Sequence, residues 1–176
     1  TLNRQITRGR VRFIGASNWS VARMAEANKY AEKNNLKGFI ISQIQWSLSV
    51  PDWQSTVDPT MRCAGEEEIR WHSQSKIPIA AYSATGNGFF SKACTTTNTV
   101  NQARWEIVQK GSKKYNCSPT QLAIAWLLNQ KPTVLPVFST TSLDHLKEVL
   151  SADRLELNNE MMNSLTFPSK SNVTFL

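Results

Sequence analysis

The chain has 176 residues, of which 40% are hydrophobic and 19% charged, a balance typical of a folded protein rather than a disordered one. This length predicts a single domain over residues 1–176, with a loose tail over residues 166–176. The formal net charge is +7, but the basic residues are scattered and no nucleic-acid-binding motif accompanies them. No apolar run approaches the ~20 residues of a membrane helix, so we expect neither nucleic acid nor a membrane as a partner.

Short apolar runs alternate with helical patterns along the chain. In chain order we expect a strand at 11–15, a helix capped by Ser20, a strand at 38–44, a loop with Pro51 and Pro59, a helix at 65–75, a strand at 77–82, a helix around Trp105, a helix at 118–129, a strand at 133–137, a helix through 146–150, and a short last helix capped by Asn158. The helix at 118–129 begins with a capping box formed by Ser118 and Gln121.

Strand–helix alternation of this kind predicts the α/β fold class, with a parallel sheet and right-handed crossovers. The apolar runs are nearly continuous, which is typical of strands covered on both faces. Four strand–helix units are too few to close a (β/α)₈ barrel, which takes ~250 residues.

Cysteine and histidine restrict the chemistry further. The three cysteines are widely separated and contain no C-x-x-C pair, and an odd number argues against a disulfide framework. With only two histidines, the sequence contains no metal-ligand cluster of recognisable spacing. We therefore expect a reduced, cytoplasmic protein without a metal site.

Polar residues follow each predicted strand, at the end where parallel α/β folds bind their ligands. They are Ser17 and Asn18, Gln43 and Gln45, Tyr82 and Ser83, and the hydroxyl run at 139–142. Amides and hydroxyls can both donate and accept hydrogen bonds, as a carboxamide group requires, and a Tyr ring can stack on a flat heteroaromatic ring. Each residue alone also has an ordinary interpretation as a turn, cap or packing residue.

Two further segments suit a phosphorylated ligand. The hydroxyl run at 139–142 opens a helix, whose N-terminal N–H groups favour phosphate. Gly86 and Gly88 allow their loop to approach a ligand closely. Their spacing does not match a Rossmann fingerprint, because the third glycine and the following acidic residue are missing.

Together these segments resemble the aldo-keto reductases. Ile14–Ser20 is similar to the family's fifth strand, Ser42–Leu48 to the sixth, and Ala81–Phe89 to the seventh strand and its loop. Leu122–Leu128 is similar to the seventh helix, and Val134–Val137 with His145–Glu148 to the eighth strand and helix. The resemblance runs from about Leu2 to Leu165. It implies a parallel (β/α) half-barrel that corresponds to the C-terminal half of a TIM (β/α)₈ barrel.

The resemblance also implies a nicotinamide cofactor, with NADP(H) favoured over NAD(H). Ser17, Asn18 and Gln43 would hold the nicotinamide carboxamide, and Tyr82 would stack on the ring. The remaining cofactor-binding residues would be Ser83, Thr85, Gly86 and Gly88 over the pyrophosphate, and Ser139, Thr141 and Glu148 at the adenosine phosphate end. Thr141 stands where many members have an Arg for the 2′-phosphate, and Val149 where an Asn often touches adenine, so binding at this end is expected to be weak or lost.

The activity implied by the resemblance is NAD(P)H-dependent carbonyl reduction. The family's catalytic Asp, Tyr, Lys and His lie on the first four strands, upstream of the segment that contains Ser17. We therefore expect a truncated or partial chain with no catalytic residue of its own, which is inactive alone. Tyr82 belongs to the stacking motif, and His72 is expected at the surface or in helix packing.

Two partners would complete such a half-barrel. Its open face would be covered by the missing N-terminal half or by a second copy of the chain, because an uncovered apolar face and free strand edges favour association. The alternative function is a non-catalytic nicotinamide-nucleotide-binding protein, or a scaffold or regulatory protein derived from the family.

Overall fold

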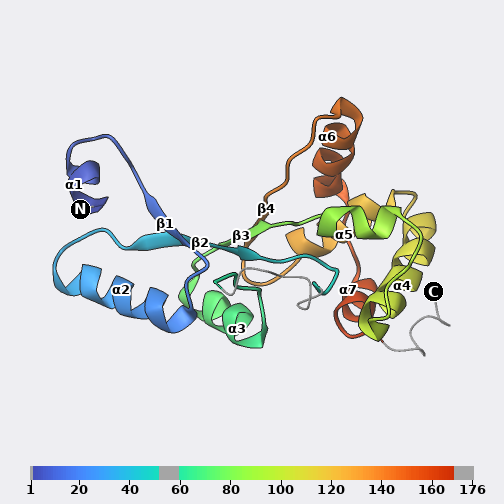
Figure 1. Cartoon of the computed structure of the whole chain (residues 1–176), viewed down its shortest axis with the longest axis horizontal. Coiled ribbons are helices and arrows are strands. Elements are labelled where there is room, and N and C mark those ends of the chain that lie inside the picture. The colour runs from blue at the N-terminus through green and yellow to red at the C-terminus, as the bar shows by residue number, and fades with distance from the viewer. Residues whose placement is uncertain (1, 52–59, 169–176) are drawn as a thin grey trace.

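The computed structural model describes residues 2–51 and 60–168, and its strands form one parallel sheet in the order β1-β2-β3-β4 (Figure 1). The strands are β1 (Ile14–Ser17), β2 (Phe39–Gln45), β3 (Ile79–Tyr82) and β4 (Val134–Pro136). The helices are α1 (Leu2–Thr7), α2 (Val21–Lys33), α3 (Glu66–Ser75), α4 (Thr99–Lys114), α5 (Pro119–Leu128), α6 (Leu143–Leu150) and α7 (Asn159–Thr166), with 3₁₀ segments η2 (Gly86–Ser91) and η3 (Ser151–Arg154). The predicted α/β class and parallel sheet are confirmed.

Helices begin where side chains satisfy their first N–H groups, as the sequence predicted. Ser20 Oγ accepts a hydrogen bond from Arg23 N at 3.3 Å, and α2 begins at the next residue. At α5, Ser118 Oγ accepts from Gln121 N at 3.1 Å while Gln121 Oε1 accepts from Ser118 N at 2.6 Å. Asn158 caps α7 in the same manner as Ser20 caps α2.

The first strand begins three residues later than predicted. We expected a strand at 11–15, whereas β1 begins at Ile14, which pairs with Phe39, the first residue of β2. The preceding residues have no strand beside them in the described chain, and Phe13 is 67% exposed. Because β1 extends to residue 17, Ser17 belongs to the strand rather than to the turn after it.

The last helix includes the start of the predicted loose tail. Thr166 ends α7, and its Oγ1 accepts a hydrogen bond from Trp126 Nε1 at 3.1 Å. Residues 169–176 of that tail lie outside the described residues, as does Pro59 of the predicted loop. Over residues 2–51 and 60–168, no helix is long and apolar enough to span a membrane.

The two faces of the sheet differ in what covers them. Ser42, Ile79 and Val134 are register partners across β2, β3 and β4, and register partners point to the same face. Ile79 and Val134 are buried in the hydrophobic core. On the opposite face, Gln43 and Leu135 both pair with Ala80 of β3, and Leu135 is 47% exposed. Within the described residues this face is therefore open, as expected of a half-barrel, whereas the other face is covered.

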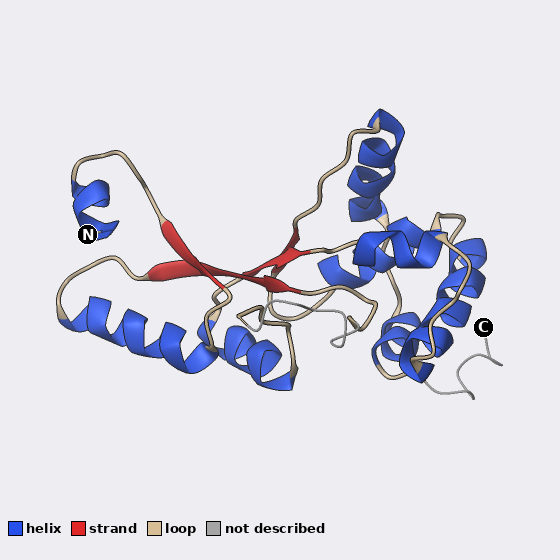
Figure 2. Cartoon of the chain, viewed as in Figure 1, coloured by secondary structure: helices blue, strands red, loops and turns tan. Residues whose placement is uncertain are grey.

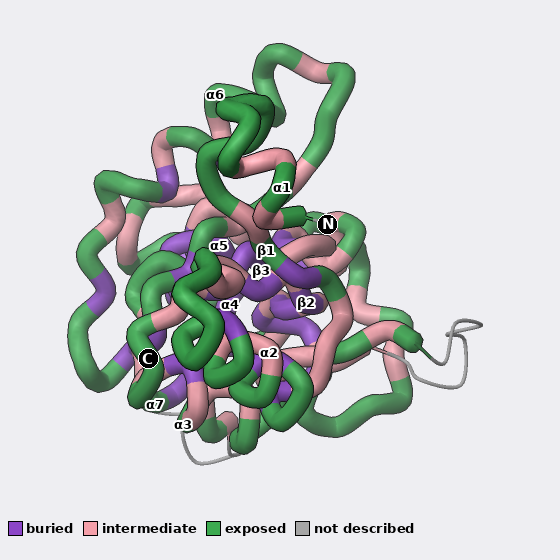
Figure 3. The backbone as a smooth tube through the Cα atoms, turned by 90° about the vertical axis from the view of Figure 1, so that its left-hand side faces the viewer, coloured by how far each residue is buried: buried purple, intermediate pink, exposed green. Residues whose placement is uncertain are grey.

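The core lies between the covered face and the helices near β3 and β4. Its largest fully buried side chains are Ile44 and Ile79 from the strands, Leu48 from the segment after β2, and Ile107, Val108, Leu122, Ile124, Leu127, Met161 and Leu165 from the helices. Figure 2 shows α2 and α3 along one side of the sheet, and α4, α5 and α7 grouped near its other end. Figure 3 shows buried residues on the strands and on α5, while α6 is mostly exposed.

A half-buried arginine connects α4 with α7 and with the segment after β2. Arg104 donates from Nε to Leu165 O at 2.8 Å, from Nη1 to Leu48 O at 2.8 Å and from Nη2 to Thr166 O at 3.1 Å. Burial lowers the pKa of its guanidinium to about 10. The group thus stays charged at neutral pH, and its charge-assisted bonds hold three backbone carbonyls.

One buried hydroxyl on the covered face of the sheet provides a test of the packing there. Among the described residues, Ser42 Oγ is buried without a hydrogen-bond partner. We predict that Ser42→Ala raises the free energy of unfolding by about 1 kcal/mol, because it removes an unsatisfied polar group. Urea denaturation provides the measurement. The matched control is Ser112→Ala, which should instead lower stability, because Ser112 Oγ donates to Gln109 O at 3.1 Å. A loss of stability in Ser42→Ala would show that the hydroxyl has a partner.

Candidate functional site

The carboxyl ends of β1, β2 and β3 bring four of the predicted residues together. Ser17 and Gln43 are register partners, and Tyr82 ends the adjacent strand β3. Asn18 follows β1 with a φ of 58°, in the left-handed region that Asn tolerates better than most residues. Its backbone N donates to Gln43 O at 2.9 Å, so the turn after β1 continues the ladder with β2.

The side chain of Asn18 is the polar centre of this cluster. Asn18 Oδ1 accepts hydrogen bonds from Tyr82 Oη at 3.0 Å and from Arg62 N at 3.2 Å. An amide oxygen has two lone pairs, so these two donors fix the orientation of the amide. The Arg62 contact was not predicted, and it left no sequence signal because it comes from the backbone.

The chain around residue 63 returns to β2 and extends the sheet beyond the end of β1. Gln45 N donates to Arg62 O at 2.8 Å, and Ala64 N donates to Gln45 O at 2.9 Å. Cys63 Sγ lies 3.4 Å from Gln45 Oε1. Burial, with a smaller contribution from Glu68, raises the pKa of the Cys63 thiol to about 11. Cys63 therefore remains a protonated hydrogen-bond donor at neutral pH and is no nucleophile there.

The loop after β3 packs on the segment after β2. Ser83 has a φ of 54°, which turns the chain sharply behind Tyr82. Gly86 N donates to Ser83 O at 2.8 Å, and Gly88 N donates to Thr85 O at 3.1 Å. A Cβ at Gly86 would clash with Ser49 Oγ. The close approach that the sequence predicted at Gly86 is thus made to the protein's own chain.

The hydroxyl run and Glu148 lie on opposite ends of α6. Ser142 caps this helix, and its Oγ accepts from His145 N at 3.3 Å. Ser139 and Thr141 are exposed on the segment that leads into it. Glu148 lies in the last turn, where Oε1 accepts a hydrogen bond from Ser118 Oγ at the start of α5. Glu148 therefore lies more than one helical turn beyond Ser142 along α6.

The remaining titratable candidate has a packing role. His72 is 1% exposed, and its Nδ1 lies 2.9 Å from Ile77 O, so this nitrogen donates to the carbonyl. Burial lowers the pKa of His72, against smaller opposing effects of the Ile77 carbonyl and Glu68. His72 is thus a buried packing residue of α3, which is one of the two positions predicted for it, the other being the surface. Across the part of the chain that the structure describes, no group of three or more His, Cys, Asp or Glu side chains could hold a metal ion.

A cavity of about 1030 Å³ opens beside the end of β2. Gln45, Arg62 and Ser49 form one part of its lining, and Trp126 and Phe167 form another. None of the eleven predicted cofactor-binding residues lines it. The predicted site instead lies along the open carboxyl edge of the sheet.

Comparisons with known proteins identify the family and the fold of the chain. The model of the aldo/keto reductase family matches residues 1–167, and the chain therefore belongs to the aldo/keto reductase family. It is 25% identical to a probable aldo-keto reductase 1 of Glycine max, over 93% of this chain and 48% of that protein. It is also similar in fold to the thermostable aldo-keto reductase Tm1743, solved with the inhibitor epalrestat, with a TM-score of 0.70 and 19% identity over 93% of this chain and 51% of that one.

The chain thus spans about half the length of both relatives. The likeness in fold confirms that the four parallel strands and their helices correspond to part of an aldo-keto reductase barrel.

The contact between Ser49 and Gly86 leads to a test by mutation. We predict that Gly86→Ala lowers the free energy of unfolding by about 2 kcal/mol or more, because the new Cβ meets Ser49 Oγ and alanine is strained at a φ of 57°. Gly9→Ala is the matched control, since Gly9 has a φ of 68° with nothing within 4 Å, and should cost only about 1 kcal/mol. Adding Ser49→Gly to Gly86→Ala should recover the difference in free energy of unfolding between the two alanine variants. Equal losses in the two alanine variants would disprove the contact.

Proposed function

We propose that these residues form the cofactor-binding half of a nicotinamide-dependent carbonyl reductase. The observation that carries the proposal is the cluster of Ser17, Asn18, Gln43 and Tyr82 at adjoining strand ends, held by the hydrogen bond from Tyr82 Oη to Asn18 Oδ1. Family membership supports an oxidoreductase-like function. A bound reduced nicotinamide would supply the hydride for reduction of a carbonyl group.

The donor set of the cluster fits a nicotinamide carboxamide. Such a group offers one carbonyl oxygen and two N–H donors, and the amides of Asn18 and Gln43 with the Ser17 hydroxyl provide both kinds of partner. Tyr82 presents an aromatic ring from the neighbouring strand, which suits stacking on a flat heterocycle. Ser83, Thr85, Gly86 and Gly88 form the loop that would lie against the pyrophosphate. Because the N–H groups of Gly86 and Gly88 already donate within the loop, the hydroxyls of Ser83 and Thr85 would supply the donors that phosphate oxygens require.

For the adenosine end we propose the exposed hydroxyls of Ser139 and Thr141 before α6. Glu148 would contribute its second carboxylate oxygen, since Oε1 already accepts from Ser118. We favour NADP(H) over NAD(H), as the family resemblance implies. Binding at this end should be weak, because Thr141 provides a hydroxyl rather than a cation for the 2′-phosphate. We place the protein in the cytoplasm, in keeping with three free cysteines.

Proton transfer to the carbonyl oxygen is proposed to come from residues outside these 176. The Tyr82 hydroxyl donates a hydrogen bond to Asn18 Oδ1, and Cys63 and His72 are engaged in part-buried hydrogen bonds. A positioned acid is needed for carbonyl reduction. The expected result is therefore background NADPH oxidation when the purified chain is mixed with simple aldehydes. A carbonyl-dependent rate well above buffer would contradict this part of the proposal.

Cofactor binding can be tested directly by titrating the chain with NADPH and following tryptophan fluorescence, since Trp19 follows Asn18 in the sequence. We predict that Tyr82→Ala weakens binding about tenfold, because it removes the stacking ring. Tyr82→Phe keeps the ring and should weaken binding only about threefold, through the lost bond to Asn18.

Tyr30→Ala serves as the control, because Tyr30 is exposed on α2 and should leave the affinity unchanged. In the same titration NADPH should bind more tightly than NADH. An equal affinity of Tyr82→Ala and the parent chain for NADPH would rule out the proposed stacking. Absence of binding of either nucleotide would favour a scaffold or regulatory role.

A further inference from the structure

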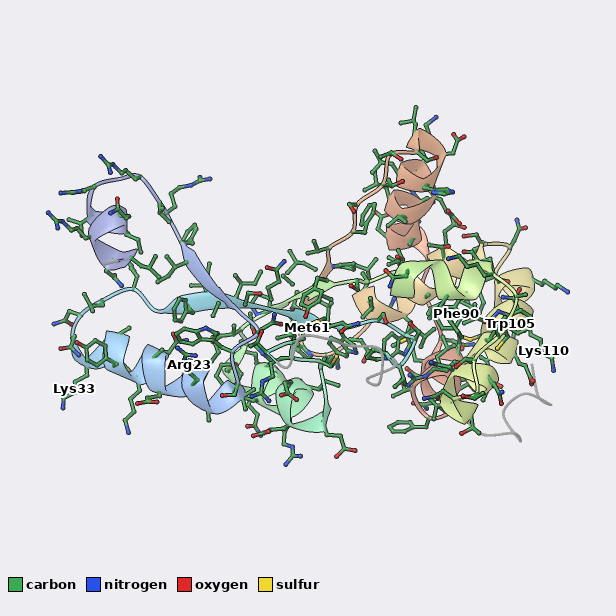
Figure 4. The ribbon with its side chains drawn as sticks, in the orientation of Figure 1. Arg23, Lys33, Met61, Phe90, Trp105 and Lys110 are labelled. Carbon is green, nitrogen blue, oxygen red and sulfur yellow. The ribbon has the colours of Figure 1, made fainter. Side chains whose placement is uncertain are left out.

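Helix α4 reaches the C-terminal end of η2 through two side chains. Gln109 Nε2 donates to Phe90 O at 2.9 Å, and Trp105 Nε1 donates to Lys92 O at 2.9 Å. Figure 4 labels Phe90 on η2 and Trp105 on α4, on neighbouring segments. The end of the loop after β3 is thus attached directly to α4.

The same helix also holds the segment after β2. Asn101 is 5% exposed and pairs with both backbone groups of Val50, donating from Nδ2 to Val50 O at 2.8 Å and accepting at Oδ1 from Val50 N at 2.7 Å. One turn later, Arg104 Nη1 donates to Leu48 O at 2.8 Å. Two side chains on one side of α4 therefore hold both backbone neighbours of Ser49.

Ser49 transmits this placement to the beginning of the loop after β3. Its side chain is 8% exposed, and its hydroxyl lies 3.1 Å from that of Ser47. Ser49 Oγ occupies the space that a side chain at Gly86 would need. Since Gly86 packs directly on this hydroxyl, a movement of Ser49 would have to move residues 83–88 or leave a gap beneath them.

We propose that Asn101 is a positioning residue for the loop over residues 83–88, and through it for the pyrophosphate of the cofactor. This inference rests on the function proposed above, in which that loop lies against the pyrophosphate. An amide suits the position because Val50 presents one donor and one acceptor, and only a side chain with both can satisfy them. Asn101 is itself held by the cap of α4, because its backbone N donates to Asn98 Oδ1 at 3.0 Å.

A positioning role for Asn101 and a purely structural role can be told apart by which ligand loses affinity when Asn101 is replaced. NADPH contains the pyrophosphate, whereas reduced nicotinamide mononucleotide has the same nicotinamide ring without it. A residue that acts through loop 83–88 should change the affinity for NADPH and spare the mononucleotide. A residue that only stabilises the fold should change both affinities or neither.

The experiment measures both affinities in Asn101→Ala and Asn101→Asp. We expect Asn101→Ala to weaken NADPH binding about tenfold with less than a twofold change for the mononucleotide. Asn101→Asp should weaken NADPH binding at least as much, because it keeps the acceptor for Val50 N but sets a buried carboxylate oxygen against Val50 O. The matched control is Gln102→Ala, the next residue on α4, which donates to Thr96 O at 2.8 Å and should leave both affinities unchanged. The proposal would be overturned if Asn101→Ala weakened the binding of both ligands equally, or left both affinities unchanged.

Hydrogen exchange separates this inference from the proposed function. The amides of Gly86 and Gly88 are bonded within the loop, and they should exchange faster in Asn101→Ala than in the parent chain and in Gln102→Ala. If the parent chain binds neither ligand, the proposed function fails, and faster exchange at these glycines would still support the loop-positioning role. Unchanged exchange in Asn101→Ala would overturn that role, whatever the binding results.

Discussion

The architecture depends on the one-sided burial of a short parallel sheet. Ile79 and Val134 point into a core built with α4 and α5, while Leu135 points the other way and is exposed. Because side chains alternate along a strand, every strand places half of its side chains on the uncovered face. The exposed apolar side chains and the two free edge strands give this face a strong tendency to be covered.

The candidate site follows from the same sheet. Parallel strands end at one edge, so residues separated by 64 positions, Asn18 and Tyr82, lie within hydrogen-bonding distance there. Left-handed backbone at Asn18 and Ser83 turns the chain away directly after β1 and β3, which leaves the strand ends accessible. The covered face packs against the helices, and the open edge carries the polar groups. Side chains of α4 hold the segments that follow β2 and β3.

Much of this could be predicted from local patterns. Ser20, Ser118 and Asn158 marked helix starts because a cap is a local interaction among four residues. The beginning of β1 was misplaced because it depends on where the neighbouring strand begins, which apolar character alone does not encode. Gly86 was identified as a close approach, but its partner Ser49 could not be, since that contact joins two loops through the tertiary fold.

Backbone contacts and long-range clamps were the least predictable features. Arg62 contributes only its N–H to Asn18, and any residue except proline has that group. Asn101 carries no sequence signal of its role, which depends on the placement of Val50 beside it.

The most direct test of the central claim is to mix this chain with the first four strand–helix units of an aldo-keto reductase and measure both association and activity. The account predicts a one-to-one complex by analytical ultracentrifugation and the appearance of carbonyl-dependent NADPH oxidation, which Tyr82→Ala reduces. A chain that stays monomeric in the mixture, with its open face still accessible to a hydrophobic dye, would contradict the account.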